Sequence, residues 1–193
     1  MNPWFAKAVL LAANVVMIVI RAPHGSRSRT VGIAENRRGT LETVLLSLAW
    51  LSFVIPLVWV ASPVFAFADY PLRPVPFAAG TACYALGLWI FHLSHRDLGT
   101  NWSITLQLRE NHTLVSNGIY RQIRHPMYLS LLVYSLGQAL AVPNWIAGPC
   151  YAVAMLPLVA LRLGPEERMM AERFGADWNA YRSRTKMLIP GIL

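Results

Sequence analysis

Charged residues are scarce in this sequence. Asp, Glu, Lys and Arg make up 13% of its 193 residues, about half the share found in an average globular protein. Hydrophobic residues make up 55%, and the few charges gather between long apolar runs instead of alternating with them. This distribution excludes an ordinary soluble domain and predicts a single membrane domain over residues 1–193.

Cysteine is nearly absent as well. Cys83 and Cys150 are the two present, and both lie inside apolar runs without the spacing of metal ligands. We expect them to be small buried side chains, so neither a disulfide nor a zinc site is predicted. His92 and His95 are three residues apart and could share one helix face, but no third ligand is suitably placed. No bound metal is therefore predicted.

Acidic residues are few, with 9 Asp and Glu against 17 Lys and Arg and a formal net charge of +8. The aromatic residues lie within apolar runs and not among the basic residues, so we expect no nucleic-acid partner. The basic residues gather in three segments, 21–43, 94–126 and 162–193. The connections 62–75 and 143–144 contain one basic residue, Arg73. By the positive-inside rule the N-terminus lies outside and the C-terminus in the cytoplasm.

Apolar runs predict an all-α integral membrane protein with five transmembrane helices. The runs cover about residues 4–20, 44–61, 76–93, 127–142 and 145–161. We expect the first to be a retained helix and not a cleaved signal, because no clean cleavage site follows it. The last two are short, so whether they fully span stays open, and Pro143-Asn144 between them predicts a tight antiparallel hairpin. Pro149 and Pro157 are expected to kink the fifth helix.

Basic residues lie at the start of the predicted fourth helix. Arg124 and His125 precede Pro126, a residue that suits the first turn of a helix because its missing N–H is no loss there. Both side chains would then lie at the N-terminal mouth of that helix, where free backbone N–H groups favour an anionic group.

Acidic residues follow the predicted fifth helix on the same side of the membrane. Glu166 and Glu167 come shortly after Arg162, and we expect them to begin an amphipathic tail helix that reaches Tyr181. The hairpin would bring these residues close to the start of the fourth helix. Because ionisable residues beside hydrocarbon are costly, the gathering predicts a functional site. Segments 96–128 and 162–190 would form it.

In order along the chain, these pieces resemble the isoprenylcysteine carboxyl methyltransferase family over roughly residues 85–190. The residues that carry the resemblance are Asp97, Leu98, Gly99, Asn101, Trp102, Ser103, His112, Leu114, Val115, Gly118, Ile119, Tyr120, Arg124, His125, Pro126, Tyr128, Asn144, Trp145, Arg162, Glu166, Glu167, Phe174, Gly175, Trp178 and Tyr181. Phospholipid N-methyltransferases share the Arg-His-Pro and Glu-Glu core, so the motifs discriminate poorly among substrates.

The resemblance implies S-adenosylmethionine as the methyl donor, bound on the cytoplasmic side without a Rossmann fold. The sequence has no Gly-x-Gly-x-x-Gly motif after a predicted strand, which agrees with this. The resemblance also implies that Arg162 and Glu167 are a catalytic pair next to the methyl group. The residues implied to bind the cofactor are His112, Leu114, Val115, Gly118, Tyr120, Arg124, His125, Pro126, Tyr128 and Glu166.

The chemistry of the acceptor separates the possible functions. A carboxylate is already ionised at neutral pH, so its methylation requires positioning and desolvation but no general base. A lipid amine must first lose a proton, for which Glu167 or His125 is the candidate base. The sequence therefore predicts methylation of an isoprenylcysteine-like carboxylate. A phospholipid or other lipophilic small-molecule methyltransferase is the first alternative. A non-catalytic lipid-binding protein and a sterol-reductase-like protein that uses NADPH are further alternatives.

The expected partners are membrane lipids and a lipophilic substrate whose chain stays in the bilayer. We expect that substrate to enter between helices near Trp145 and segment 101–106. The membrane would be the inner or plasma membrane in a prokaryote and the endoplasmic reticulum in a eukaryote. The sequence gives no indication of the oligomeric state.

Overall fold

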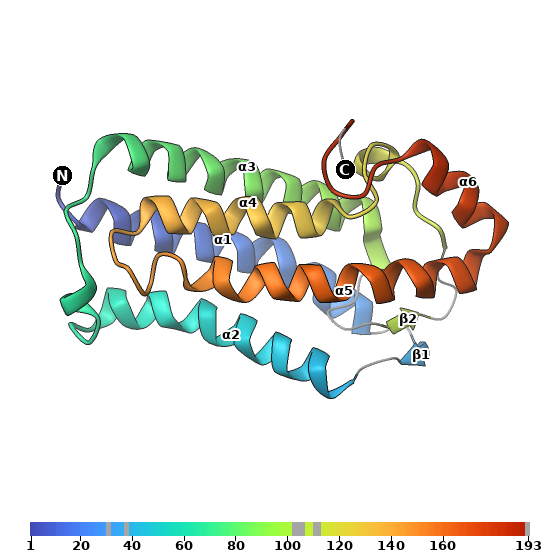
Figure 1. Ribbon diagram of the computed structural model, residues 1–193, viewed down its shortest axis with the longest axis horizontal. Coiled ribbons are helices and arrows are strands. Elements are labelled where there is room, and N and C mark those ends of the chain that lie inside the picture. Colours follow the sequence, from blue (N-terminus) through green and yellow to red (C-terminus); the bar gives the residue numbers. More distant parts are fainter. Residues whose placement is uncertain (30–31, 37–38, 102–106, 110–112, 192–193) are drawn as a thin grey trace.

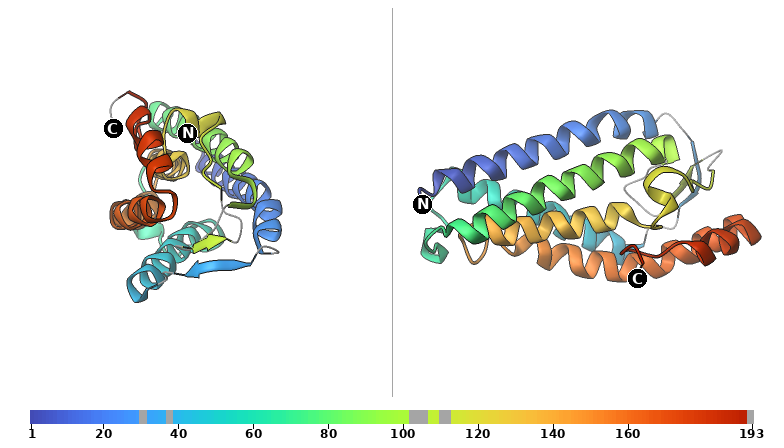
Figure 2. Two further views of the ribbon diagram at one scale, coloured as in Figure 1. Left: turned by 90° about the vertical axis from the view of Figure 1, so that its right-hand side faces the viewer. Right: turned by 90° about the horizontal axis from the view of Figure 1, so that it is seen from above.

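The structure, a computed structural model, describes residues 1–29, 32–36, 39–101, 107–109 and 113–191. Long helices run side by side in an elongated bundle and alternate in direction along the chain (Figure 1, Figure 2). They are α1 (Trp4–Arg29), α2 (Thr40–Ala61), α3 (Pro74–Leu98), α4 (Pro126–Ala141) and α5 (Cys150–Phe174). A shorter helix, α6 (Ala176–Arg184), turns back beside the end of α5. Single 3-10 turns are η1 (Ala66–Ala68), η2 (Gly99–Asn101) and η3 (Gly118–Arg121).

One small sheet interrupts the helical fold. Strands β1 (Ile33–Asn36) and β2 (Gln107–Arg109) pair in antiparallel orientation. They come from the two basic loops that follow α1 and α3, and they lie at the end of the bundle where α4 begins (Figure 1). The sequence did not predict these strands, because they are short and pair across more than seventy residues.

Three helices in the described part of the chain are long and apolar enough to cross a membrane. They are Trp4–Gly25 of α1, α2 and α3. Helix α4 has 16 residues, and the second half of α5 is charged. Each predicted run therefore overlaps a bundle helix, but the crossing of the bilayer by α4 and α5 stays a prediction, as does the orientation.

The connection between α4 and α5 is longer than predicted. It covers residues 142–149, and the fully buried Asn144 organises it: the side-chain oxygen accepts hydrogen bonds from the N–H groups of Ile146 and Ala147 at 3.0 and 2.8 Å. The amide nitrogen of Asn144 donates to Phe65 O at 2.7 Å. A dipeptide turn was therefore the wrong prediction. Pro149 precedes α5 as its N-cap residue instead of kinking it.

Helix α5 is also longer than predicted. It continues through Pro157 and Pro165 to Phe174, so Glu166 and Glu167 lie inside it. The predicted tail helix beginning at Glu166 was therefore wrong. The helix ends at Gly175, which has φ 52°, a conformation that glycine adopts at low cost. A proline removes one backbone donor and need not end a helix that is packed on its neighbours.

Helices α3 and α4 approach closely through small residues. A Cβ atom added at Gly80 would lie 2.6 Å from the backbone nitrogen of Ala141, and one at Gly87 would lie 2.9 Å from that of Tyr134. Gly137 of α4 faces the backbone of Gly80 at 2.9 Å in the same way. Such contacts are typical of helix pairs in membranes, where packing and not water exclusion holds helices together.

Replacing Gly87 by Val tests this contact. The added side chain would meet backbone atoms of α4 that cannot move aside, so we expect a loss of about 1–3 kcal/mol in stability. Thermal unfolding in detergent would measure it. Gly39→Ala is the matched control, because nothing lies within 4 Å of a Cβ at Gly39. Equal unfolding temperatures for the two variants would contradict the close approach.

Candidate functional site

The predicted gathering of ionisable residues forms at the end of the bundle where α4 begins. His125 is the N-cap residue of α4 and Pro126 is its first residue, as the sequence predicted. The backbone N–H groups of Arg124 and His125 donate to the carbonyl oxygens of Lys186 and Met187 at 2.8 and 3.0 Å. The chain that follows α6 therefore holds the segment before α4 in place, as a neighbouring strand would.

Arg124 and Glu167 form a buried ion pair between this segment and α5. Arg124 Nε donates to Glu167 Oε1 at 2.8 Å, and Nη2 lies 3.4 Å from Oε2, which is bidentate geometry. Both residues are 9% exposed. Arg124 Nη1 donates to the carbonyl oxygens of Thr185 and Arg182 at 2.5 and 3.3 Å. Arg124 thus joins α5, α6 and the start of α4.

His125 lies between the two adjacent glutamates. Its Nε2 atom is 2.9 Å from Glu167 Oε1, and its Nδ1 atom is 3.9 Å from Glu166 Oε1. The Tyr128 hydroxyl donates to Glu166 Oε2 at 2.5 Å, and the Tyr128 ring stacks on that of His125 with centroids 5.6 Å apart. The structure therefore brings Arg124, His125, Glu166 and Glu167 together, as predicted from the topology. We call these four residues the ion cluster. Tyr128, which the resemblance implied, lies beside them.

The surroundings of Glu167 set its protonation. Burial alone would raise the pKa of this carboxyl group, but hydrogen bonds from His125 and Arg124 and their nearby charges outweigh burial and lower it to about 2. The group is therefore a carboxylate at every physiological pH.

This pKa predicts a loss of stability in acid. A carboxyl group whose pKa falls on folding stabilises the native state above its ordinary value of 4.5, and the stabilisation is lost as the pH falls toward 2. We expect the unfolding temperature in detergent to fall progressively between about pH 5 and pH 2. Glu167→Gln should lack this component of the decline. Parallel declines of the variant and the wild type would contradict the assignment.

Arg162 does not pair with Glu167 in the structure. Its Nη2 atom lies 3.2 Å from Oε1 of Glu42, in the first turn of α2. Five residues along a helix correspond to a rotation of about 140°, so Arg162 and Glu167 leave α5 in different directions. Arg162 remains close to the cluster, because its guanidinium carbon lies 6.0 Å from the centre of the Tyr128 ring.

Glu42 is a residue that the sequence analysis missed. It is 5% exposed, and Arg162 is 8% exposed, so the pair is removed from water. A lone acid at the start of an apolar run, next to an arginine-rich loop, was the available signal. It was overlooked because residues 1–75 carry none of the motifs.

The turn before α4 positions Tyr120. Gly118 has φ 55°, and a Cβ atom there would overlap the carboxylate of Asp97. That carboxylate accepts the backbone N–H of Ile119 at 2.9 Å. Tyr120 is buried, and its carbonyl oxygen accepts the Tyr181 hydroxyl at 2.7 Å. Glycine at position 118 is thus required for the chain to enter the site.

The remaining predicted cofactor-binding residues, Leu114, Val115 and His112, precede η3 in the sequence. Leu114 and Val115 are half-buried in the extended chain before η3, and no hydrogen bond or ion pair in the described part of the structure links them to the cluster. His112 lies outside the described residues, as does most of segment 101–106.

Trp145 lies far from the site. Its backbone N–H donates to Ala68 O at 3.0 Å and its ring contacts Tyr70, both at the end of the bundle where α3 begins. Asn101 follows the opposite end of α3. Residues 102–106 lie outside the described part of the chain, so the predicted substrate entry between Trp145 and segment 101–106 stays a prediction.

Comparisons with known proteins support a membrane methyltransferase fold. The chain is similar to a solved structure of the eukaryotic intramembrane Ras methyltransferase, an isoprenylcysteine carboxyl methyltransferase, with a TM-score of 0.54 and 22% sequence identity. The similarity covers 82% of this chain and 55% of that one. The chain is therefore mainly helical, with three candidate spans and the fold of that enzyme.

Curated relatives carry the same name. A protein-S-isoprenylcysteine O-methyltransferase of Dictyostelium discoideum is 29% identical over 115 residues, which cover 58% of this chain and 48% of the relative. Enzyme B of Arabidopsis thaliana is 31% identical over 89 residues, covering 46% of this chain and 45% of the relative. A probable enzyme of Oryza sativa subsp. indica is 22% identical over 97% of both chains. In the first two matches the chain spans about half the length of the relative.

The family model named phospholipid methyltransferase matches residues 75–177. The matched range is more than half of the chain and contains α3, α4 and α5 with the ion cluster between them. The chain therefore belongs to the phospholipid methyltransferase family.

Proposed function

We propose that the chain is a methyltransferase that uses S-adenosylmethionine and methylates the carboxylate of an isoprenylcysteine-like lipophilic substrate. The names of the relatives support the reaction, although the chain matches only about half the length of most of them. The arrangement of charges at the end of the bundle supports the choice of acceptor.

The state of Glu167 carries the proposal. Arg124 and His125 hold this carboxylate with a pKa of about 2, so it is a poor general base at neutral pH. A lipid ammonium requires a base before it can attack a methyl group, whereas a carboxylate does not. With Glu167 unable to act as the base, His125 is the candidate that a lipid amine would still need, whereas a carboxylate acceptor needs neither residue. In this proposal Glu167 positions Arg124 and His125 and takes no proton.

Arg162 is the group that we propose for binding the acceptor carboxylate. A guanidinium has five N–H donors in a planar fork that matches a carboxylate. Glu42 Oε1 lies 3.2 Å from Nη2 of Arg162, and the centre of the Tyr128 ring lies 6.0 Å from Cζ of Arg162. This support fixes the orientation of Arg162 before a substrate arrives, which reduces the cost of aligning the acceptor.

The residues of the site fit S-adenosylmethionine. When bound, this cofactor supplies an electrophilic methyl group on a positively charged sulfonium. Glu166 is a half-buried carboxylate beside the stacked rings of His125 and Tyr128, which suits a cationic ligand. In the described part of the chain, the buried Nε1 of Trp178 has no hydrogen-bond partner and is an available donor nearby on α6. We propose that the cofactor-binding site is formed by Arg124, His125, Pro126, Tyr128 and Glu166, together with Leu114, Val115, Gly118, Tyr120 and His112.

The arginine-rich loops support a cytoplasmic location for the proposed site. The loops that carry β1 and β2 lie at the same end of the bundle as Arg124, while the N-terminus lies at the other (Figure 1). By the positive-inside rule we propose that the site end faces the cytoplasm. The prenyl chain would stay in the bilayer against apolar helix faces, while the carboxylate of the prenylated cysteine reaches Arg162.

The test is methyl transfer from labelled S-adenosylmethionine to N-acetyl-S-farnesylcysteine by detergent-purified protein. A base-labile methyl ester is the expected product, and the amide of the same compound is the control acceptor. A base-stable product formed on phosphatidylethanolamine would replace the proposal with phospholipid N-methylation. Failure of S-adenosylhomocysteine to stabilise the protein, together with stabilisation by NADPH, would exclude methyl transfer.

A further inference from the structure

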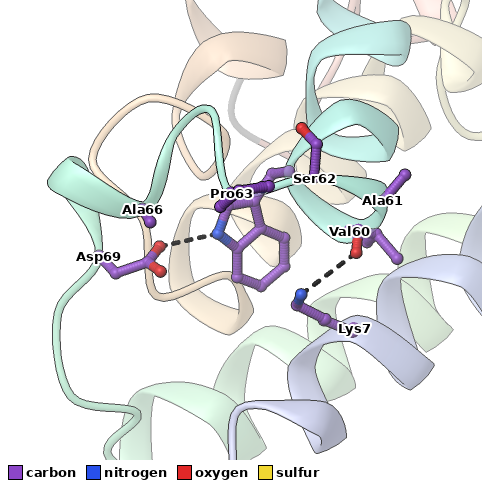
Figure 3. A pocket seen from close by; sticks show the side chains of 8 residues that line it. Lys7, Val60, Ala61, Ser62, Pro63, Ala66 and Asp69 are labelled. Carbon is purple, nitrogen blue, oxygen red and sulfur yellow. Dashed lines mark hydrogen bonds between the residues drawn. The ribbon is translucent and has the colours of Figure 1, made fainter.

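A pocket lies at the end of the bundle opposite the ion cluster. It has a volume of about 330 Å³ and lies between the first turn of α1 and the end of α2 with the turn that follows it (Figure 3). Its charged lining residues are Lys7 of α1 and Asp69 after η1 (Figure 3). Trp59, which also lines the pocket, contacts both of them. The volume is at the lower end of the range for small-molecule sites.

Lys7 supplies positive charge to this pocket. Its ammonium donates to Val60 O at 3.2 Å and lies 5.0 and 5.3 Å from the ring centres of Trp4 and Trp59. An ammonium has three N–H donors, so this one hydrogen bond leaves capacity for an anionic ligand. The contacts with the two rings hold the charge at the wall of the pocket.

Asp69 supplies negative charge to the same pocket. Its Oδ1 atom accepts hydrogen bonds from Trp59 Nε1 and from Asn144 Nδ2, both at 2.7 Å. The residue is exposed, and its carboxylate is held in a fixed orientation by two neutral donors. Lys7 and Asp69, both in the described part of the chain, form no ion pair with each other. The pocket thus presents one cation and one anion that both contact the same indole ring.

The surroundings of the pocket indicate a lipid headgroup. The candidate spans α1 and α3 begin at this end of the bundle and α2 ends there. Aromatic side chains at the same end are strongly exposed: Trp4 at 66%, Trp145 at 71% and Phe67 at 80%. Exposed aromatic residues at helix ends are typical of the membrane interface, where headgroups lie.

We propose that this pocket binds the headgroup of a zwitterionic phospholipid. The phosphate lies against Lys7 and the ammonium against Asp69, while the acyl chains follow the apolar surface of α1 and α2. Asp69 disfavours a headgroup that carries negative charge alone. The site is separate from the ion cluster and is not the place of methyl transfer.

The test compares the thermal unfolding of the purified chain in mixed micelles with different lipids. Phosphatidylethanolamine is expected to raise the unfolding temperature by about 5 °C at saturation, and phosphatidylglycerol by much less. Lys7→Gln should remove most of the increase. Arg73→Gln, which removes an exposed cation at the same end outside the pocket, should keep it. Asp69→Asn, which retains an oxygen to accept both hydrogen bonds, should make the two lipids equivalent.

Three outcomes would overturn the proposal. Equal stabilisation of the wild type by the two lipids would show that lipid stabilises the protein without recognition of the headgroup. Equal losses in Lys7→Gln and Arg73→Gln would show a general effect of surface charge. Equal stabilisation by soluble glycerophosphoethanolamine would show that the ligand is not a membrane lipid. If Lys7→Gln does not fold, the comparison of lipids on the wild type decides the question.

Discussion

Replacing Arg162 by Lys is expected to lower kcat/KM for methyl transfer to a prenylated cysteine by about 100-fold or more. Lysine keeps the charge, so the buried pair with Glu42 survives in reduced form. It loses the planar fork that we propose binds the acceptor carboxylate. Losses of about 100- to 1000-fold are typical when one donor that stabilises a reacting oxygen is removed. Binding of S-adenosylhomocysteine, measured by thermal shift, should be unchanged, because Arg162 is not assigned to the cofactor.

The matched control is Arg168→Lys, an exposed position on the next turns of the same helix. It should retain full activity. Glu42→Gln should reduce activity by a smaller factor, because it removes only the support of Arg162. If Glu42 acts through Arg162, the double variant should be no worse than Arg162→Lys alone. Additive losses, or full activity in Arg162→Lys, would refute the assigned roles.

Replacing Glu167 by Gln is expected to have the largest effect on stability. The change leaves Arg124, which is 9% exposed, without its carboxylate partner. Removing one member of a buried pair costs about 3–5 kcal/mol, because the remaining charge is not compensated. Arg124 also binds the backbone of residues 182 and 185, so we expect α6 and the chain after it to loosen first. Thermal unfolding and protease digestion near the C-terminus would measure both effects.

The matched control for this variant is Arg168→Gln, which removes an exposed charge from the next residue of α5. It should unfold within about 0.5 kcal/mol of the wild type, as most surface substitutions do. A similar small effect in Glu167→Gln would mean that the ion cluster contributes little to holding α6 against the bundle.

Local hydropathy was sufficient to predict the helices. The runs at 4–20, 44–61 and 76–93 correspond to α1, α2 and α3, because an apolar stretch of that length is stable in a bilayer only as a helix. The same information misplaced both ends of α5. Whether a proline or a glycine ends a helix depends on the packing around it, and this packing is not a local property.

The sequence by itself also determined that Arg124, His125, Glu166 and Glu167 meet, because alternating helices return them to one end of the bundle. Only the tertiary structure decided which of these charges are partners. The rotation of α5 about its axis directs Glu167 to Arg124 and His125, and it directs Arg162 to Glu42 of α2. That rotation results from the close packing of several helices at once. It therefore cannot be predicted from any single segment of the sequence.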